Sequence, residues 1–176
     1  MNEYKISFCT VCMNRLHHLK QTLPINIINN ATYKNLEFIV LDYGSTDGLE
    51  NYIKESMASY VECGRLIYYK MSSRKYFDRS HSRNLMFKLA NGEIICNVDA
   101  DNFTGKGFAS YINAKFQNKK NIFLTPIGDS TNPDVMGRIS VTKKNFLKVR
   151  GYDERLKGYG FEDYDLCNRL EINGVR

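Results

Sequence analysis

The sequence predicts an α/β fold, in which a mostly parallel central sheet is flanked by helices. Apolar runs of strand length alternate with segments whose apolar residues recur at helical spacing, from the first residues onward. This alternation is typical of parallel sheets with helical crossovers. The 176 residues contain no internal repeat, no low-complexity segment and no linker. We therefore expect one domain that spans residues 1–176.

Three strands are expected in the first half of the chain. Each is a run rich in β-branched and aromatic residues that ends in a polar loop. They cover residues 5–12, 36–41 and 66–70.

Two helices connect these strands. In the first, Leu and Ile recur at helical spacing over residues 16–27, and Pro24 is expected to bend or break the helix. The second is expected over residues 49–61, where Asp47 followed by Glu50 has the spacing of a capping box.

The second half of the chain continues the alternation and then changes character. A polar loop over residues 72–80 leads into a short helix, and after Pro126 the sequence becomes rich in turn residues. Glycines at 151, 158 and 160 bracket a loop before the last helix. The elements are expected at 85–90 (helix), 94–98 (strand), 108–116 (helix), 122–126 (strand), 138–142 (strand), 145–149 (helical turns) and 162–173 (helix).

The strand at residues 94–98 ends in two carboxylates, Asp99 and Asp101. They would point the same way if the extended backbone continued, because strand side chains alternate between faces. Two adjacent like charges are costly unless a cation or hydrogen-bond donors compensate them. A second Asp-x-Asp occurs at Asp163 and Asp165, so the motif alone is weak. Its place at the carboxyl end of a buried strand favours a metal or phosphate site.

A second acidic pair, Glu162 and Asp163, begins the last helix after a Gly-Tyr-Gly loop. The helix dipole alone favours acidic residues at this position. Together with Asp99 and Asp101, however, the pair could line one cleft. Such a cleft would suit metal-assisted group transfer, which needs a cation for a leaving diphosphate and a carboxylate base for an incoming hydroxyl.

Composition narrows the class of protein. Hydrophobic residues make up 43% and charged residues 25%, which is typical of a globular protein. The net charge of +6 suits an anionic ligand or a peripheral contact with an anionic membrane surface. No nucleic-acid-binding signature is present, so we expect no nucleic-acid role. The five cysteines, including the C-x-x-C at Cys9 and Cys12, are interpreted as small core residues and not as a disulfide framework. We therefore expect a cytoplasmic protein, which could also bind to the inner face of the membrane.

Five motifs follow one another along the chain: Thr10 with Asn14-Arg15, the loop Asp42-Tyr43-Gly44-Ser45-Thr46-Asp47-Gly48, Ser82-Arg83-Asn84, Asp99-Ala100-Asp101, and Gly160-Phe161-Glu162-Asp163. In this order they closely resemble the GT-A glycosyltransferases of family 2. The C-terminal part, from Gly151 onward, also resembles the galactosyltransferase group. The similarity covers nearly the whole chain.

The resemblance implies an inverting transferase that moves a sugar from a nucleotide-diphospho-sugar, usually a UDP-sugar, to a glycan or other hydroxyl acceptor with the help of Mn²⁺ or Mg²⁺. Asp163 would be the catalytic base, and Glu162 would orient hydroxyl groups. Many relatives have a second aspartate where this chain has Tyr43, which could stack on a ring instead. By resemblance, Thr10, Asn14, Asp42, Arg83, Asn84 and Asp99 would bind the nucleotide-sugar, and Asp99 and Asp101 the metal.

Several alternatives stay open. Asp42 could simply cap its own loop as an Asx turn. The third metal ligand would be either water or a residue beyond Arg176, and in the second case the sequence would be a C-terminally truncated domain. The protein could also be a non-catalytic or incomplete module that binds a nucleotide or glycan. A sugar nucleotidylyltransferase is more remote, because the loop after the first strand lacks that group's Gly-rich, Arg-bearing sequence.

Overall fold

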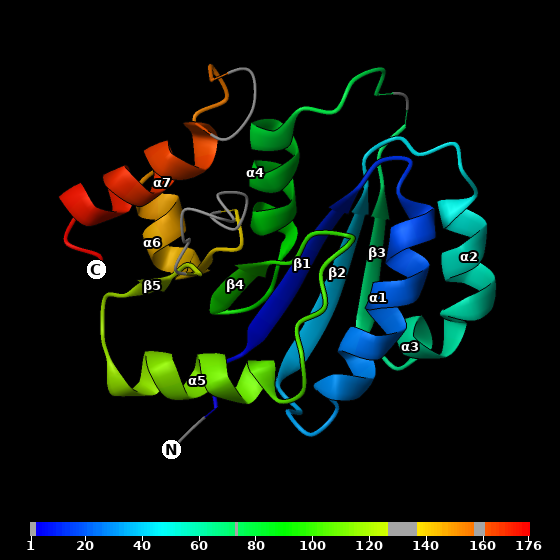
Figure 1. Ribbon diagram of the computed structural model, residues 1–176, viewed down its shortest axis with the longest axis horizontal. Helices are drawn as coiled ribbons and strands as arrows, with labels where there is room; N and C mark the ends of the chain where they lie inside the picture. The colour runs from blue at the N-terminus through cyan, green and yellow to red at the C-terminus, as the bar shows by residue number, and fades with distance from the viewer. Residues whose placement is uncertain (1–2, 73, 127–136, 157–160) are drawn as a thin grey trace.

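A six-stranded sheet between two layers of helices forms the centre of the molecule (Figure 1). The computed structural model describes residues 3–72, 74–126, 137–156 and 161–176. The predicted turn-rich segment after Pro126 and the Gly158–Gly160 loop therefore lie largely outside the described residues. The elements are β1 (Ile6–Cys12), α1 (Leu16–Asn29), β2 (Leu36–Asp42), α2 (Leu49–Ser56), α3 (Ala58–Glu62), β3 (Leu66–Lys70), α4 (Arg79–Leu89), β4 (Ile94–Asn97), α5 (Phe108–Asn118), β5 (Phe123–Leu124), β6 (Ser140–Thr142), α6 (Lys143–Lys148) and α7 (Phe161–Ile172).

The strand order in the sheet is β3-β2-β1-β4-β6-β5. The first four of these strands run parallel, whereas β6 pairs antiparallel with both β4 and β5. The mostly parallel sheet predicted from the sequence is thus confirmed. The chain reverses its winding between β1 and β4, and the loops after these two strands leave the sheet at the same edge. Ligands of open α/β sheets bind at such a point.

Each face of the sheet carries its own hydrophobic core, because strand side chains alternate between faces. Phe8 and Val40 face the layer of α1, α2 and α5, whereas Cys9, Ile39 and Leu41 face the layer of α4, α6 and α7 (Figure 1). All five side chains are buried. The helix that carries Arg83 and the helix that carries Asp163 therefore cover the same face.

Three helices differ from the sequence-based expectation. Helix α1 continues through Pro24, because its packing side chains Leu23 and Ile27 are buried and outweigh the cost of about 3 kcal/mol for an interior proline. The helix expected over residues 49–61 is divided into α2 and α3 at Met57. Helix α4 begins earlier than expected, since Asp78 accepts a hydrogen bond from the backbone N–H of His81 and caps it.

The predicted capping box at α2 does not form. Gly48, in the left-handed conformation, precedes the helix, and no side chain caps it. Asp47 instead accepts a hydrogen bond from the backbone N–H of Leu16, at 2.8 Å, and so supports the start of α1. Glu50 forms ion pairs with Lys54 and Lys70.

Four of the five cysteines, Cys9, Cys12, Cys96 and Cys167, are buried as expected of core residues, whereas Cys63 is exposed and the expectation is wrong for it. Cys9 and Cys12 belong to the cores on opposite faces of the sheet, so they cannot share a metal ion or form a disulfide. Burial raises the pKa of the Cys12 thiol to about 12, which leaves it protonated at neutral pH. Within the described part of the chain, no helix is long and apolar enough to span a bilayer.

Candidate active site

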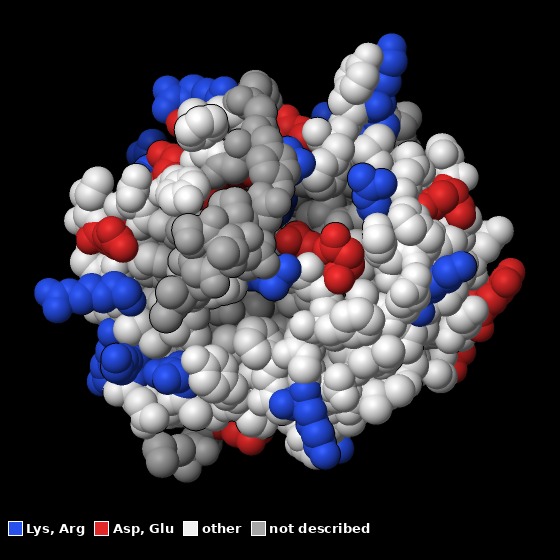
Figure 2. All heavy atoms as spheres, viewed as in Figure 1, with Lys and Arg blue, Asp and Glu red and all other residues white. Residues whose placement is uncertain are grey.

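The acidic turn after β4 lies at the carboxyl edge of the sheet. The strand ends at Asn97, and the chain then turns, so Asp99 and Asp101 do not continue an extended strand. Asp99 accepts a hydrogen bond from Asn97 Nδ2 at 2.9 Å, and the same nitrogen donates to the carbonyl of Gly137 at 2.8 Å. The Asp99 side chain is 41% exposed, and Asp101 is also exposed. Figure 2 shows acidic side chains in the hollow at the centre of this face, with basic side chains close by.

Arg83 of α4 connects this turn with α7. Its Nη1 donates to Asp163 Oδ1 at 2.8 Å and lies 3.8 Å from Glu162 Oε1. Its Nη2 lies 3.5 Å from Asp99 Oδ1. The Arg83 side chain is only 10% exposed, so its charge is compensated almost entirely by these carboxylates. Residues 83, 99, 162 and 163, which are distant in sequence, therefore form one cluster.

The acidic pair of α7 is buried. Glu162 and Asp163 are only 4% and 8% exposed. They lie in the first turn of the helix, where the helix dipole favours negative charge. Burial raises the pKa of the Asp163 carboxyl, and Glu162 raises it further, although the ion pair with Arg83 acts in the opposite direction. Asp163 is thus a more basic carboxylate than one in water, as a general base requires.

Gly137 leaves room for this ion pair. A Cβ atom at this position would lie 3.0 Å from Arg83 Nη2 and 3.1 Å from Asp163 Oδ2. The Gly137 carbonyl accepts a hydrogen bond from Asn97 Nδ2, and the same nitrogen donates to Asp99. Gly137 therefore lies beside the Arg83–Asp163 pair and is linked to Asp99 through Asn97.

The residues predicted to line the nucleoside side lie along the loops after β1 and β2. Thr10 donates to the Val98 carbonyl at 2.7 Å and thereby supports the start of the acidic turn. Asn14 Oδ1 accepts from the backbone N–H of Thr46 at 2.8 Å, which joins the two loops. Asp42 is 1% exposed: Oδ1 accepts from the N–H of Ser45 at 2.6 Å, in the loop-capping geometry that was the alternative interpretation. The second oxygen of Asp42 accepts from the Tyr68 hydroxyl at 2.7 Å.

Asn84 bonds to the segment after α6 and not to the acidic cluster. Its Oδ1 accepts from the Tyr152 N–H at 2.8 Å, and its Nδ2 donates to the Tyr152 carbonyl at 2.9 Å and to Glu154 Oε1 at 2.8 Å. The amide therefore fixes the backbone of Tyr152. The nucleotide contact predicted for Asn84 stays a prediction, as does that of Asp42.

Tyr43 cannot stack on a ligand ring, because its side chain is fully buried. Its hydroxyl lies 2.8 Å from His81 Nδ1, and Arg74 lies over its ring at 5.5 Å from the centroid. Phe77 packs edge-on against the same ring. The chain thus uses Tyr43 to hold the segment between β3 and α4 against the loop after β2.

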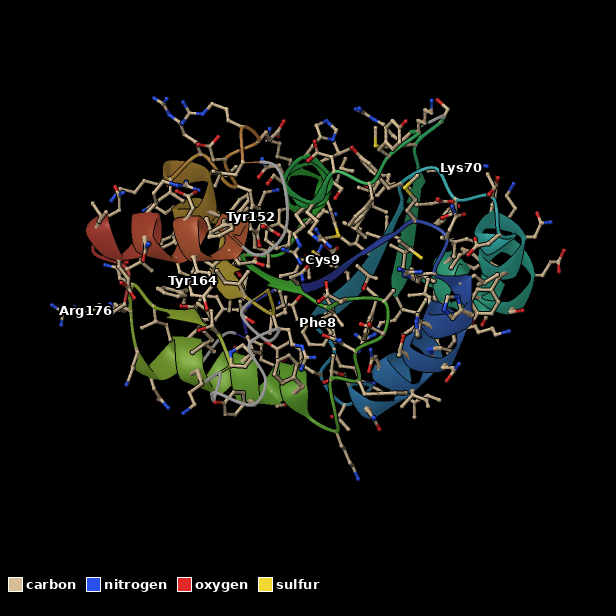
Figure 3. All side chains as sticks on the ribbon, turned by 45° about the horizontal axis from the view of Figure 1, so that its top comes forward. Phe8, Cys9, Lys70, Tyr152, Tyr164 and Arg176 are labelled. Carbon is tan, nitrogen blue, oxygen red and sulfur yellow. The ribbon has the colours of Figure 1, made fainter. Side chains whose placement is uncertain are left out.

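The sequence analysis did not identify Tyr152. This residue is 2% exposed, lies between α4 and the N-terminal end of α7, and places its ring 5.6 Å from the Arg83 guanidinium (Figure 3). Its hydroxyl has no hydrogen-bond partner within the described residues. The only available signal was the galactosyltransferase-like segment that begins at Gly151, which does not by itself single out an aromatic residue.

The acidic turn suits a divalent cation that is shared with a substrate. Within the described residues, no group of three or more potential ligands could hold a metal by itself. Asp99 and Asp101 nevertheless offer hard carboxylate oxygens on an accessible turn. Mg²⁺ and similar ions are commonly bound by one or two carboxylates, with substrate phosphates and water in the other positions. The residues present therefore fit Mn²⁺ or Mg²⁺ in the presence of a diphosphate.

An open α/β sheet with an acidic turn at its switch point, joined through an arginine to an acidic helix start, defines the class of GT-A nucleotide-sugar transferase folds. The family model "Glycosyl transferase family 2" matches residues 7–167, which is most of the chain. The chain therefore belongs to glycosyltransferase family 2. No curated protein matches it at a significant level.

Solved structures of glycosyltransferases share the fold. The chain is similar to the mannosyltransferase PcManGT from Pyrobaculum calidifontis in complex with GDP-Man and Mn²⁺, with a TM-score of 0.78 and 16% identity over 100% of this chain and 54% of that one. For S. aureus TarS 1-349 the TM-score is 0.78 and the identity 17%, over 96% of this chain and 56% of that one. For GalNAc-T7 with UDP, GalNAc and Mn²⁺, the corresponding values are 0.75, 15%, 96% and 41%. The chain thus spans about half the length of the first two proteins.

Proposed function

We propose that the protein transfers a sugar from a nucleotide-diphospho-sugar, with UDP as the expected nucleotide, to a hydroxyl group of a glycan or another acceptor, with inversion at the anomeric carbon. The observation that carries this proposal is the Arg83-centred cluster, in which the accessible Asp99 and the buried Asp163 lie on either side of one guanidinium. Membership of glycosyltransferase family 2 and the GDP-Man and UDP-GlcNAc complexes of similar folds support it.

In this proposal Asp163 receives the proton of the acceptor hydroxyl. The acceptor oxygen forms a bond to the anomeric carbon while the bond between that carbon and the diphosphate oxygen breaks, and the nucleoside diphosphate leaves on the opposite face. Asp163 is too weak a base to remove the proton beforehand, so proton transfer accompanies attack. A well-placed base typically contributes about 10²–10⁴-fold to the rate.

The other residues of the cluster bind and orient. Glu162, which is buried beside Asp163, orients a sugar or acceptor hydroxyl. Arg83 favours the ionised form of Asp163 and offers positive charge close to Asp99. Asp99 and Asp101 would hold Mn²⁺ or Mg²⁺, which neutralises charge that develops on the departing diphosphate. Thr10, Asn14 and Asp42 shape the loops around the nucleoside.

Thermal unfolding tests donor binding without requiring turnover. UDP should raise the Tm in the presence of Mn²⁺ but not in EDTA, because a ligand that binds only the native state stabilises it. Asp101→Ala should remove this dependence on metal while leaving the Tm of the free protein unchanged. Equal stabilisation by UDP in EDTA would contradict the metal assignment.

Turnover tests the base. UDP or GDP release from UDP-GlcNAc and GDP-Man is measured for the wild type and for Asp163→Asn, which keeps the size of the side chain but cannot accept the proton. We expect kcat to fall by about 10²–10⁴-fold with little change in the affinity for UDP. Wild-type turnover by Asp163→Asn at saturating donor would exclude Asp163 as the base. Nucleotide binding without turnover in the wild type would favour the non-catalytic module.

A further inference from the structure

A cavity of about 570 Å³ lies at the edge of the sheet opposite the acidic cluster. Its wall includes Tyr4 just before β1, residues 91–93 just before β4, and Thr142 at the end of the antiparallel β6. The C-terminal end of α5 and the first residues of α6 complete it. Because parallel strands begin at this edge, the cavity is separated from the Arg83-centred cluster by the length of the sheet.

The cavity is strongly basic. Four lysines line it, together with one acidic residue, Glu93, in the described part of the chain. Lys143 is less available to a ligand, because its Nζ already donates hydrogen bonds to the carbonyls of Lys88 at 2.9 Å and Ala90 at 2.5 Å. The remaining three, which form no ion pair with a described residue, are Lys119, Lys120 and Lys144.

Asn145 adds a hydrogen-bonding amide to the lysines of the cavity wall. It lines the wall and is 8% exposed, and its backbone N–H donates to Thr142 Oγ1 at 3.2 Å. Its side-chain amide makes no hydrogen bond to any described residue. The amide is not among the buried polar atoms that lack a partner, so it is open to the cavity and can donate a hydrogen bond to a ligand there.

Figure 2 shows basic side chains along the left edge of the molecule, in the region of α5 and β5. Mutual repulsion among unpaired ammonium groups is relieved when an anion binds between them. A concave site that combines several ammonium groups with an amide N–H donor suits a compact group with several acceptor oxygens. Phosphate has this chemistry, whereas a neutral sugar does not need the charges.

We propose that this cavity binds a phosphate group, carried either by a free phosphorylated molecule or by a lipid headgroup. Lys119, Lys120 and Lys144 supply the charge, and the amide of Asn145 donates a hydrogen bond from the wall. The inference does not depend on the proposed sugar transfer, because it concerns a different edge of the sheet and different residues.

The test measures the binding of tripolyphosphate by calorimetry, without nucleotide or divalent metal. The triple variant Lys119→Gln, Lys120→Gln, Lys144→Gln should lose at least about tenfold in affinity, and Asn145→Ala several-fold. The control triple variant Lys20→Gln, Lys34→Gln, Lys106→Gln removes the same charge from exposed positions outside the cavity and should change the affinity less than about twofold. Equal losses in the two triple variants would show a diffuse effect of net charge and overturn the proposal.

Vesicle binding distinguishes the two sources of phosphate. Vesicles of phosphatidylcholine with and without phosphatidylglycerol are sedimented with each variant. The lipid headgroup would be assigned as the ligand if the wild type sediments only with the anionic vesicles. The cavity triple variant should then lose this binding, and the control triple variant should keep it. Tripolyphosphate binding with that same lysine dependence but no vesicle binding would assign a free ligand. Absence of both refutes the site.

Discussion

Replacing Arg83 by Met should be the most informative single perturbation of the cluster. Met keeps much of the buried volume but removes the charge that faces Asp99, Glu162 and Asp163. Removing one partner of a buried ion pair leaves an uncompensated charge and typically costs about 3–5 kcal/mol. The 2.8 Å contact and the 10% exposure of the Arg83 side chain place this pair in the buried class.

The cost should depend on pH in a defined direction. The pKa of Asp163 is already raised by burial in spite of Arg83, and without the arginine it rises further. The folded variant therefore takes up a proton at a pH at which the unfolded chain is still ionised. The free energy of unfolding that Arg83→Met loses at pH 7 should therefore be partly regained at lower pH. The gain should occur as the pH falls through the raised pKa of Asp163 in the folded variant toward the ordinary aspartate value.

Urea unfolding at pH 7 and pH 5 measures both effects. At pH 7 we expect a loss of about 3–5 kcal/mol, or a Tm lower by about 10 °C for a chain of this size. Arg155→Met is the matched control: the side chain of Arg155 is 90% exposed, so losing its solvent-screened pair with Asp153 should leave the free energy of unfolding nearly unchanged. A loss below about 1 kcal/mol for Arg83→Met, or an equal loss at both pH values, would refute the reasoning.

Three further predictions concern neighbouring structure. Tyr152→Phe removes a buried hydroxyl that has no hydrogen-bond partner among the described residues, so the free energy of unfolding should stay within about 0.5 kcal/mol or rise, and a loss above 1 kcal/mol would reveal a partner outside them. Burial acts to raise the pKa of Glu37, but hydrogen bonds from Ser7, Asn91 and Lys5 outweigh it and lower the pKa. Glu37→Gln should therefore destabilise by about 1–3 kcal/mol at pH 7 in chemical denaturation, and this difference should shrink as the pH falls below the ordinary glutamate value through the lowered one. Gly92→Ala should cost at least about 1–3 kcal/mol in the same assay, since its Cβ would lie 2.6 Å from the Ser7 backbone nitrogen, and an unchanged midpoint would contradict this geometry.

The sequence by itself determined the fold class and the members of the acidic cluster. Short apolar runs that alternate with helical segments specified the parallel strands, because a strand covered by helices on both faces needs apolar side chains on both. The positions of Asp99 and Asp101 after a buried strand, and of Glu162 and Asp163 at a helix start, were visible because strand ends and helix starts have local sequence signals.

Only the tertiary structure decided how these residues are used. Arg83 and Asp163 are 80 positions apart, and no local pattern reports that their side chains meet at 2.8 Å. Asn84, adjacent to Arg83 in sequence, faces away and fixes the backbone of Tyr152, because neighbouring helical residues point in different directions. Tyr43 is buried against His81 rather than free for stacking. Hydrogen-bond partners and burial depend on which elements pack together, and that packing is a property of the whole chain.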